Sequence, residues 1–252
     1  MRPNQLRTIW AEGGTAVNGW LHIPSSWSAE VMAHAGFDSV TVDLQHGLSD
    51  YESAVTMFQA IATTDVIPLA RSTWNDPAQI MRLLDAGAYG IICPMINTRA
   101  EAETFVGACR YPPLGYRSLG PTRARVYAGA DYAHHANDTI LTLAMIETKQ
   151  ALNNLADILT TPGLDGVFVG PGDLRFSLTG KPGMDLSDPI LLKALAQIAE
   201  VTRENGRIAG IWVPTAATGK QMADLGYQLI TLSTDTRLLA AAAEEMIKQM
   251  KS

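Results

Sequence analysis

The chain has 252 residues, of which 47% are hydrophobic and 17% charged, a balance typical of a globular protein. Its formal net charge of −6 argues against nucleic acid or an anionic membrane as the main partner. The N-terminal residues lack the apolar run of a secretory signal, and no stretch reaches the ~18 apolar residues that suit a bilayer span. Two cysteines form neither a zinc-site spacing nor a disulfide framework. We therefore expect a cytoplasmic protein.

Short apolar runs recur along the chain, and a longer segment with helical periodicity follows each of them. Their nearly continuous apolar character is typical of parallel strands covered on both faces. The predicted strands are Val17–Leu21, Ser39–Val42, Ile67–Ala70, Gly90–Pro94, Leu141–Ile146, Gly166–Val169, Ala209–Val213 and Leu229–Leu232. Eight such units favour a closed (β/α)8 barrel, a TIM barrel that forms a single domain over residues 1–252. A glycine-rich dinucleotide fingerprint is missing after the first strand, which argues against an open Rossmann sheet.

Helix boundaries are marked by capping residues and glycines. Helices are predicted to start near Asp50, Pro77, Thr98, Pro189 and Asp235, where N-cap residues or first-turn prolines precede periodic segments. Thr98 and Glu101 have the spacing of a capping box. Gly36, Gly87 and Gly226 follow helical segments in the position of left-handed C-caps.

Residues 110–137 break this alternation. The segment is rich in glycine, proline and tyrosine, and Arg117 and Arg123 lie in its basic first half. Long loops in compact domains are usually functional or disordered, and clustered arginines suit anion capture. We expect either a plain surface loop or a role in substrate closure or subunit contact.

Charged and titratable residues are concentrated where predicted strands end. Asp43 and His46 follow the second strand, Arg71 the third, Glu147 the fifth and Asp173 the sixth. In a barrel these carboxyl ends meet at one rim, which carries the catalytic groups. The remaining strand ends offer His22, Asn97, Trp212, Ser233 and Asp235.

These residue types fit metal-assisted chemistry on a 2-oxo acid. Two carboxylates, Glu147 and Asp173, suit Mg²⁺, Mn²⁺ or Co²⁺ better than Zn²⁺, which prefers histidine and cysteine. His46 can act as a general base through a metal-bound water, with Asp43 fixing its tautomer. Arg71 can stabilise the charge of a developing enolate. A Schiff-base mechanism would need a lysine at a strand end, and the sequence places none there.

Each of these residues also has a structural interpretation when taken alone. Asp43 can cap a loop, His46 can be an ordinary loop histidine, and Arg71 can form a salt bridge at the barrel rim. Glu147 can cap the next helix, and Asp173 can act as an N-cap after a turn. Only their convergence on one rim favours catalysis.

Four segments together resemble the HpcH/HpaI aldolase family: Val42–Gly47, Pro68–Arg71, Met145–Thr148 and Val167–Leu174. The resemblance covers nearly the whole chain. It implies a barrel of the phosphoenolpyruvate/pyruvate type and a class II aldolase that cleaves 4-hydroxy-2-oxo acids to an aldehyde and pyruvate or hydroxypyruvate. It also implies a homohexamer.

Carried onto this sequence, the resemblance implies specific roles. Glu147 and Asp173 match the metal ligands, His46 the base, Asp43 its partner and Arg71 the arginine beside the pyruvyl oxygen. The expected substrate-binding residues are Arg71, Gly172, Asp173, Trp212, Arg117 and Arg123. The chain departs from the family pattern at Gln45, where a glutamate is common, and at Met145, where some members have glutamine.

Other activities fit the same residues. A lyase or decarboxylase acting on a 2-oxo diacid or an acyl-CoA would use the same metal-enolate chemistry. A barrel that has lost catalysis and serves as a binding protein is the non-enzymatic alternative.

Overall fold

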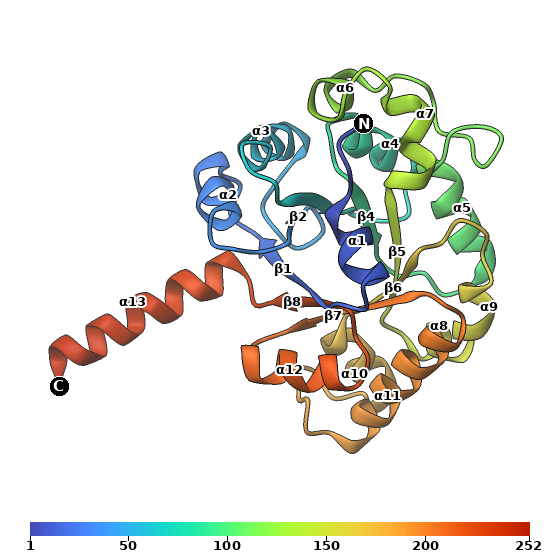
Figure 1. Cartoon of the computed structure of the whole chain (residues 1–252). Coiled ribbons are helices and arrows are strands. Elements are labelled where there is room, and N and C mark those ends of the chain that lie inside the picture. Colours follow the sequence, from blue (N-terminus) through green and yellow to red (C-terminus); the bar gives the residue numbers. More distant parts are fainter.

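The computed structural model describes all 252 residues, and its eight parallel strands close into a barrel in sequential order from β1 to β8 (Figure 1). The strands are β1 Ala16–Leu21, β2 Ser39–Asp43, β3 Ile67–Arg71, β4 Gly90–Cys93, β5 Leu141–Ile146, β6 Gly166–Val169, β7 Ile208–Val213 and β8 Leu229–Leu232. All eight predicted strands and the (β/α)8 barrel are confirmed. Most strand residues are buried because helices cover the outer face of most strands and packed side chains fill the interior.

Helices surround the barrel and connect each strand to the next (Figure 1). They are α1 Gln5–Ala11, α2 Ser26–Ala33, α3 Tyr51–Ile61, α4 Pro77–Asp85, α5 Arg99–Cys109, α6 Thr122–Ala128, α7 Tyr132–Thr139, α8 Lys149–Asn153, α9 Leu155–Leu159, α10 Pro171–Thr179, α11 Pro189–Glu204, α12 Ala216–Asp224 and α13 Asp235–Lys251. The predicted capping box of Thr98 and Glu101 is present at the start of α5. The last helix begins at Asp235 as predicted, but its N-cap is Thr234 and not Asp235. No helix is both long enough and apolar enough to cross a membrane.

Helix α1 covers the N-terminal end of the barrel (Figure 1). The Trp10 indole donates to the carbonyl of Gln228 at 2.9 Å, just before β8. The Asn4 amide donates to the carbonyl of Thr139 at 3.0 Å, shortly before β5. These contacts close the N-terminal end of the barrel and leave the C-terminal ends of the strands uncovered by this segment.

Residues 110–137, expected to be a long loop, contain the short helix α6 and most of the short helix α7, which ends at Thr139. The segment lies beside the chain's N-terminus, where the Arg2 amide donates to the carbonyl of Ala128 at 2.7 Å and the Met1 ammonium contacts Asp131 at 2.6 Å. It connects α5 to the start of β5, and such helix-to-strand connections lie at the N-terminal end of a barrel. The segment therefore stands at the end opposite the strand C-termini.

Helix α13 departs from the usual barrel arrangement, because it projects away from the strands (Figure 1). Its first residue is buried, whereas every residue from Thr236 to the end of the helix is exposed. In most (β/α)8 barrels the last helix packs on the outside of the sheet. In this chain the outer face of β8 and β1 lacks that cover.

Candidate active site

A cleft of ≈ 330 Å³ opens at the C-terminal rim of the barrel. A pocket of this size fits small organic molecules. The lining residues are Trp20, His22, His46, Arg71, Met145, Phe168, Gly170, Pro171, Gly172, Asp173, Met184, Trp212, Thr234 and Arg237. The sequence-predicted residues His46, Arg71, Gly172, Asp173 and Trp212 are therefore gathered in one place, with Asp43 and Glu147 buried beside them.

Asp43 and Arg71 form a buried ion pair at the base of the cleft. The two residues are register partners at the ends of β2 and β3, so parallel pairing sets them side by side. Arg71 donates from Nε to Oδ1 at 2.7 Å and from Nη2 to Oδ2 at 2.5 Å. This two-point contact fixes the plane of the Arg71 guanidinium and holds its positive charge at the cleft wall.

The rest of the Asp43 carboxylate is also fully engaged. The Trp20 indole donates to Oδ2 at 3.1 Å, and His22 Nε2 lies 2.9 Å from the same oxygen. Burial alone would raise the pKa of Asp43, but the hydrogen bonds from His22 and Arg71 and the charge of Arg71 hold it well below its usual range. Asp43 is therefore a permanent anion that orients its neighbours.

The imidazole that contacts Asp43 is His22, and not His46 as expected. Asp43 meets His46 only through the backbone, where the His46 amide donates to Oδ1 at 3.3 Å. The register explains this, because Leu21 pairs with Val42 and the next residue on each strand, His22 and Asp43, are then neighbours. The expectation that Asp43 fixes the tautomer of His46 is wrong for this chain. His46 still lines the cleft.

Glu147 is a buried carboxylate that follows β5. Its Oε1 accepts a hydrogen bond from the amide of Met95 at 2.7 Å. Met95 has a φ of 57°, a left-handed conformation that is uncommon outside glycine and turns its amide toward the carboxylate. The other carboxylate oxygen of Glu147, Oε2, lies against Gly170. A Cβ atom added to Gly170 would lie only 2.9 Å from this oxygen. Oε2 of Glu147 is therefore close to the N-cap of α10, the helix that carries Asp173 in its first turn.

Burial raises the pKa of Glu147 to about 6, and the nearby charge of Asp173 adds to the increase. The amide of Met95 and the charge of Arg71 oppose it. Two carboxylates that repel each other in a partly dehydrated cleft favour a bound cation, which removes the repulsion. The electrostatics of the pair therefore fit a cation site.

The donor set fits a hard divalent cation that keeps open positions. Glu147 and Asp173 supply carboxylate oxygens, and the structure has no group of three or more histidine, cysteine, aspartate or glutamate side chains that could hold a metal ion. A structural zinc site needs four protein ligands, which this cleft does not offer. Mg²⁺ and Mn²⁺ accept one or two carboxylates and complete their shell with water and substrate oxygens.

Aromatic and apolar side chains form the remaining walls. Trp20 and Phe168 stack with ring centroids 5.5 Å apart. Met145 is buried and contributes an apolar side chain to the cleft. Such walls exclude water and strengthen the electrostatic contacts inside.

Arg117 and Arg123 do not join this cleft. Arg117 is fully buried and forms an ion pair with Asp85 at 2.7 Å and a hydrogen bond to the Tyr132 hydroxyl at 2.9 Å. Arg123 donates to the carbonyls of Ala86 at 2.7 Å and Phe58 at 3.0 Å, at the C-terminal ends of α4 and α3. Both arginines tie the α6–α7 segment to the barrel, so neither binds substrate in the cleft of its own subunit.

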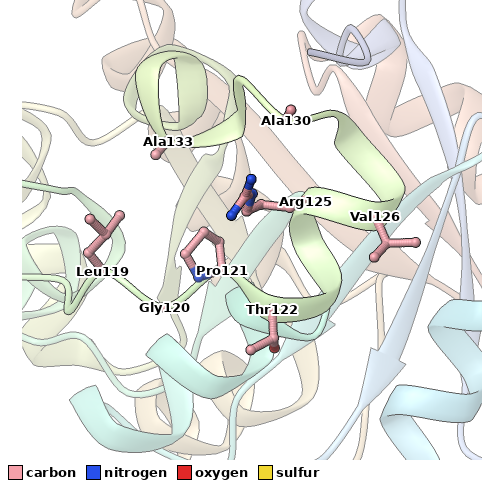
Figure 2. Close-up of a pocket in the computed structure, with 8 residues that line it drawn as sticks. All are labelled: Leu119, Gly120, Pro121, Thr122, Arg125, Val126, Ala130 and Ala133. Carbon is pink, nitrogen blue, oxygen red and sulfur yellow. The ribbon is translucent and has the colours of Figure 1, made fainter.

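A larger, shallower hollow lies over α6 and α7, with Arg125 at its centre (Figure 2). Its lining residues are Leu119, Gly120, Pro121, Thr122, Arg125, Val126, Ala130 and Ala133. None of them is a carboxylate or an imidazole, so the hollow cannot hold a metal or supply a base. The carboxylates and imidazoles expected for the site lie instead in and beside the cleft at the strand ends.

Several cleft residues were missed by the sequence analysis. His22 was placed at a strand end but not assigned a role, although its position directly after the first strand is the same signal that identified Asp43. Trp20, Phe168 and Met184 are apolar and indistinguishable from core residues in the sequence. Arg237 lies in the first turn of α13, just after the eighth strand end, where Ser233 and Asp235 were considered from the sequence but Arg237 was not.

Comparison with known proteins agrees with this geometry. Residues 19–242 match the model of the HpcH/HpaI aldolase/citrate lyase family. The chain is 40% identical to a hydroxypyruvate/pyruvate aldolase of Rhizorhabdus wittichii, over 99% of both chains. It is 38% identical to a 4-hydroxy-2-oxo-heptane-1,7-dioate aldolase of Salmonella dublin, over 96% of this chain and 93% of the relative.

A solved structure shows the same fold. The crystal structure of an HpcH/HpaI aldolase/citrate lyase family protein from Burkholderia cenocepacia superposes with a TM-score of 0.92 at 30% identity, over 99% of this chain and 100% of the other. The matched region includes every strand end that lines the cleft. The chain is therefore a member of the HpcH/HpaI aldolase/citrate lyase family.

Proposed function

We propose that the protein is a divalent-metal-dependent class II aldolase, a carbon–carbon lyase. It reversibly cleaves 4-hydroxy-2-oxo acids to an aldehyde and a 2-oxo acid, either pyruvate or hydroxypyruvate. The observation that carries the proposal is the Glu147–Asp173 carboxylate pair, set in the same cleft as the Asp43-anchored Arg71. The two relatives named as aldolases support the reaction class.

Glu147 and Asp173 would hold Mg²⁺, Mn²⁺ or Co²⁺. When bound, the metal supplies Lewis acidity to the ketone and carboxylate of the donor. Gly172 and Asp173 belong to the first turn of α10, whose free amides and helix dipole favour an anion. We assign the donor carboxylate to this turn.

Arg71 and His46 carry out the remaining steps. Arg71 uses Nε and Nη2 to bind Asp43, which leaves Nη1 free to contact the oxygen on which negative charge develops. His46 lines the cleft and moves a proton between C3 of the donor and water. His22, held by Asp43, is the second imidazole in reach of the bound substrates.

Metal removal together with carboxylate variants tests the reaction class. Wild-type protein, Glu147→Gln and Asp173→Asn are stripped with a chelator, reloaded with Mg²⁺, Mn²⁺ or Co²⁺, and assayed with pyruvate and hydroxypyruvate against a panel of aldehydes. We expect the stripped wild type to be inactive and reloading to restore it, whereas both variants stay at least about a thousandfold slower because the metal site is broken.

A matched control removes a carboxylate far from the cleft. Glu200→Gln, an exposed position on α11, keeps wild-type activity if the effect belongs to the site. Full aldolase activity after thorough chelation would overturn the proposal. Turnover of a 2-oxo diacid or an acyl-CoA without any aldehyde reaction would instead assign the decarboxylase or lyase activity.

The protein is also proposed to be a homo-oligomer, with a hexamer expected for the family. Helix α13 exposes a stripe of large apolar side chains that includes Leu239 at 64%, Met246 at 72% and Met250 at 86% exposure. An apolar groove of ≈ 230 Å³ lies outside β1 and β8, beside α12. Its lining residues are Thr15, Val17, Ala216, Gly219, Lys220, Ala223, Ile230 and Leu232. We assign α13 of a second copy to this groove, because an exposed apolar helix and an uncovered sheet face in one chain complement each other.

A further inference from the structure

Arg237 is a cation at the cleft that has no ion-pair partner. It lines the same cleft as Arg71 and Asp173. Arg71, the other arginine that lines the cleft, is neutralised because it binds Asp43. An exposed guanidinium with free N–H groups beside a substrate cleft is suited to bind an anion.

The backbone around Arg237 is firmly held. Thr234 caps α13 by accepting from the Arg237 amide at 3.2 Å. The buried carboxylate of Asp235 accepts hydrogen bonds from the amides of His22 at 2.8 Å and Ile23 at 3.2 Å. The first turn of α13 is thereby attached to the loop after β1, even though the rest of the helix leaves the barrel.

The side chain of Arg237 rests on Trp212. The guanidinium carbon lies 5.3 Å from the indole ring centroid, within the range of a cation–π contact. The indole is itself fixed, because its Nε1 donates to the carbonyl of Ser233 at 3.0 Å, and Ser233 has a left-handed φ of 55°. A contact with the ring face leaves the N–H edges of the guanidinium available for a ligand.

The donor does not need this charge. Its carboxylate and ketone oxygens are assigned to the first turn of α10, the metal and Arg71. The remaining positive group in the cleft therefore faces the second substrate. We propose that Arg237 binds an anionic group, a carboxylate or a phosphate, on the aldehyde acceptor and so selects for anionic acceptors. This inference rests on the proposed aldolase function.

Paired acceptors of different charge test the assignment. Metal-loaded wild type, Arg237→Gln and Arg237→Lys are assayed with pyruvate and either 4-oxobutanoate or its neutral counterpart butanal. A second pair, glyceraldehyde 3-phosphate and glyceraldehyde, distinguishes phosphate from carboxylate.

We expect wild type to prefer the anionic member of at least one pair. Arg237→Gln should lower kcat/KM for that acceptor about 10- to 100-fold more than for its neutral counterpart, as loss of a charge-assisted hydrogen bond predicts. Arg237→Lys should retain part of the preference.

Arg203→Gln is the matched control, because it removes an exposed arginine from α11 away from the cleft and should leave the preference intact. Deuterium exchange at C3 of pyruvate and of hydroxypyruvate in D₂O is measured in parallel. If wild type catalyses this exchange but shows no preference for either anionic acceptor, the role of Arg237 is overturned and the aldolase proposal stands. Equal losses of kcat/KM for charged and neutral acceptors in Arg237→Gln would have the same meaning. Absence of exchange into both 2-oxo acids in wild type would overturn both proposals.

Discussion

At the scale of single residues, the chemistry of the cleft depends on how strand register pairs side chains. Asp43 and Arg71 are neighbours because β2 and β3 align them, and His22 reaches Asp43 because β1 and β2 align Leu21 with Val42. The sequence predicted the rim position of Asp43 and Arg71 from the ends of apolar runs. It assigned the wrong imidazole because closeness along the chain, three residues from Asp43 to His46, was taken for contact in space.

Replacing Asp43 by asparagine is expected to destabilise the protein by about 3–5 kcal/mol at neutral pH, because Arg71 is left as an unpaired buried cation. The pKa of Asp43 is lowered in the folded protein, so its contribution to stability is complete above the unfolded-state pKa near 4 and is lost as the pH falls below it. The difference in unfolding free energy between wild type and Asp43→Asn should therefore shrink by about 1.4 kcal/mol for each pH unit below about 4.

Urea denaturation at a series of pH values measures this difference. Asp224→Asn, an exposed aspartate at the end of α12, is the matched control and should show little change at any pH. If the difference in unfolding free energy between wild type and Asp43→Asn is constant or increases from pH 5 to pH 3, that result would contradict a lowered pKa for Asp43.

At the scale of secondary-structure elements, the predicted strands were correct and the 110–137 segment was not. The strands were identifiable because complete burial demands unbroken apolar runs. Helices α6 and α7 are seven and eight residues long and lack side-chain N-caps, so neither periodicity nor capping marked them. Arg117 was expected to bind substrate, yet it is buried, and Asp85 and Tyr132 compensate its burial. Such a long-range partner is invisible in the local sequence.

Helix α13 provides the prediction at this scale. If α13 of one copy packs in the groove of another, then charged substitutions such as Met246→Glu should weaken assembly because they bury a charge against an apolar surface. Light scattering coupled to size-exclusion chromatography should report a smaller species for the variant than for wild type. Glu245→Gln, on the same helix, should assemble normally. A monomeric wild type at micromolar concentration would contradict the assignment.

At the scale of the whole molecule, barrel closure makes one site from residues scattered along most of the chain. Asp43, Arg71, Glu147 and Asp173 come from four different βα units, and closing the barrel brings them to one rim. The sequence was enough to predict this convergence, since eight βα units in order leave little freedom in topology. The position of α13 away from its own barrel was not predictable. The same pattern of apolar residues suits a helix that packs on its own barrel and a helix that packs on the barrel of another copy.

The central claim is that Glu147 and Asp173 hold a metal that allows a 2-oxo acid to lose a proton from C3. The most direct measurement is proton NMR of pyruvate incubated in D₂O with the protein and Mg²⁺ or Mn²⁺, which detects the enolate without any aldehyde. We predict that the C3 methyl signal disappears with wild type and metal, and that it persists after chelation and with Glu147→Gln. Exchange that is equally fast in chelated wild type, or in Glu147→Gln, would contradict the account.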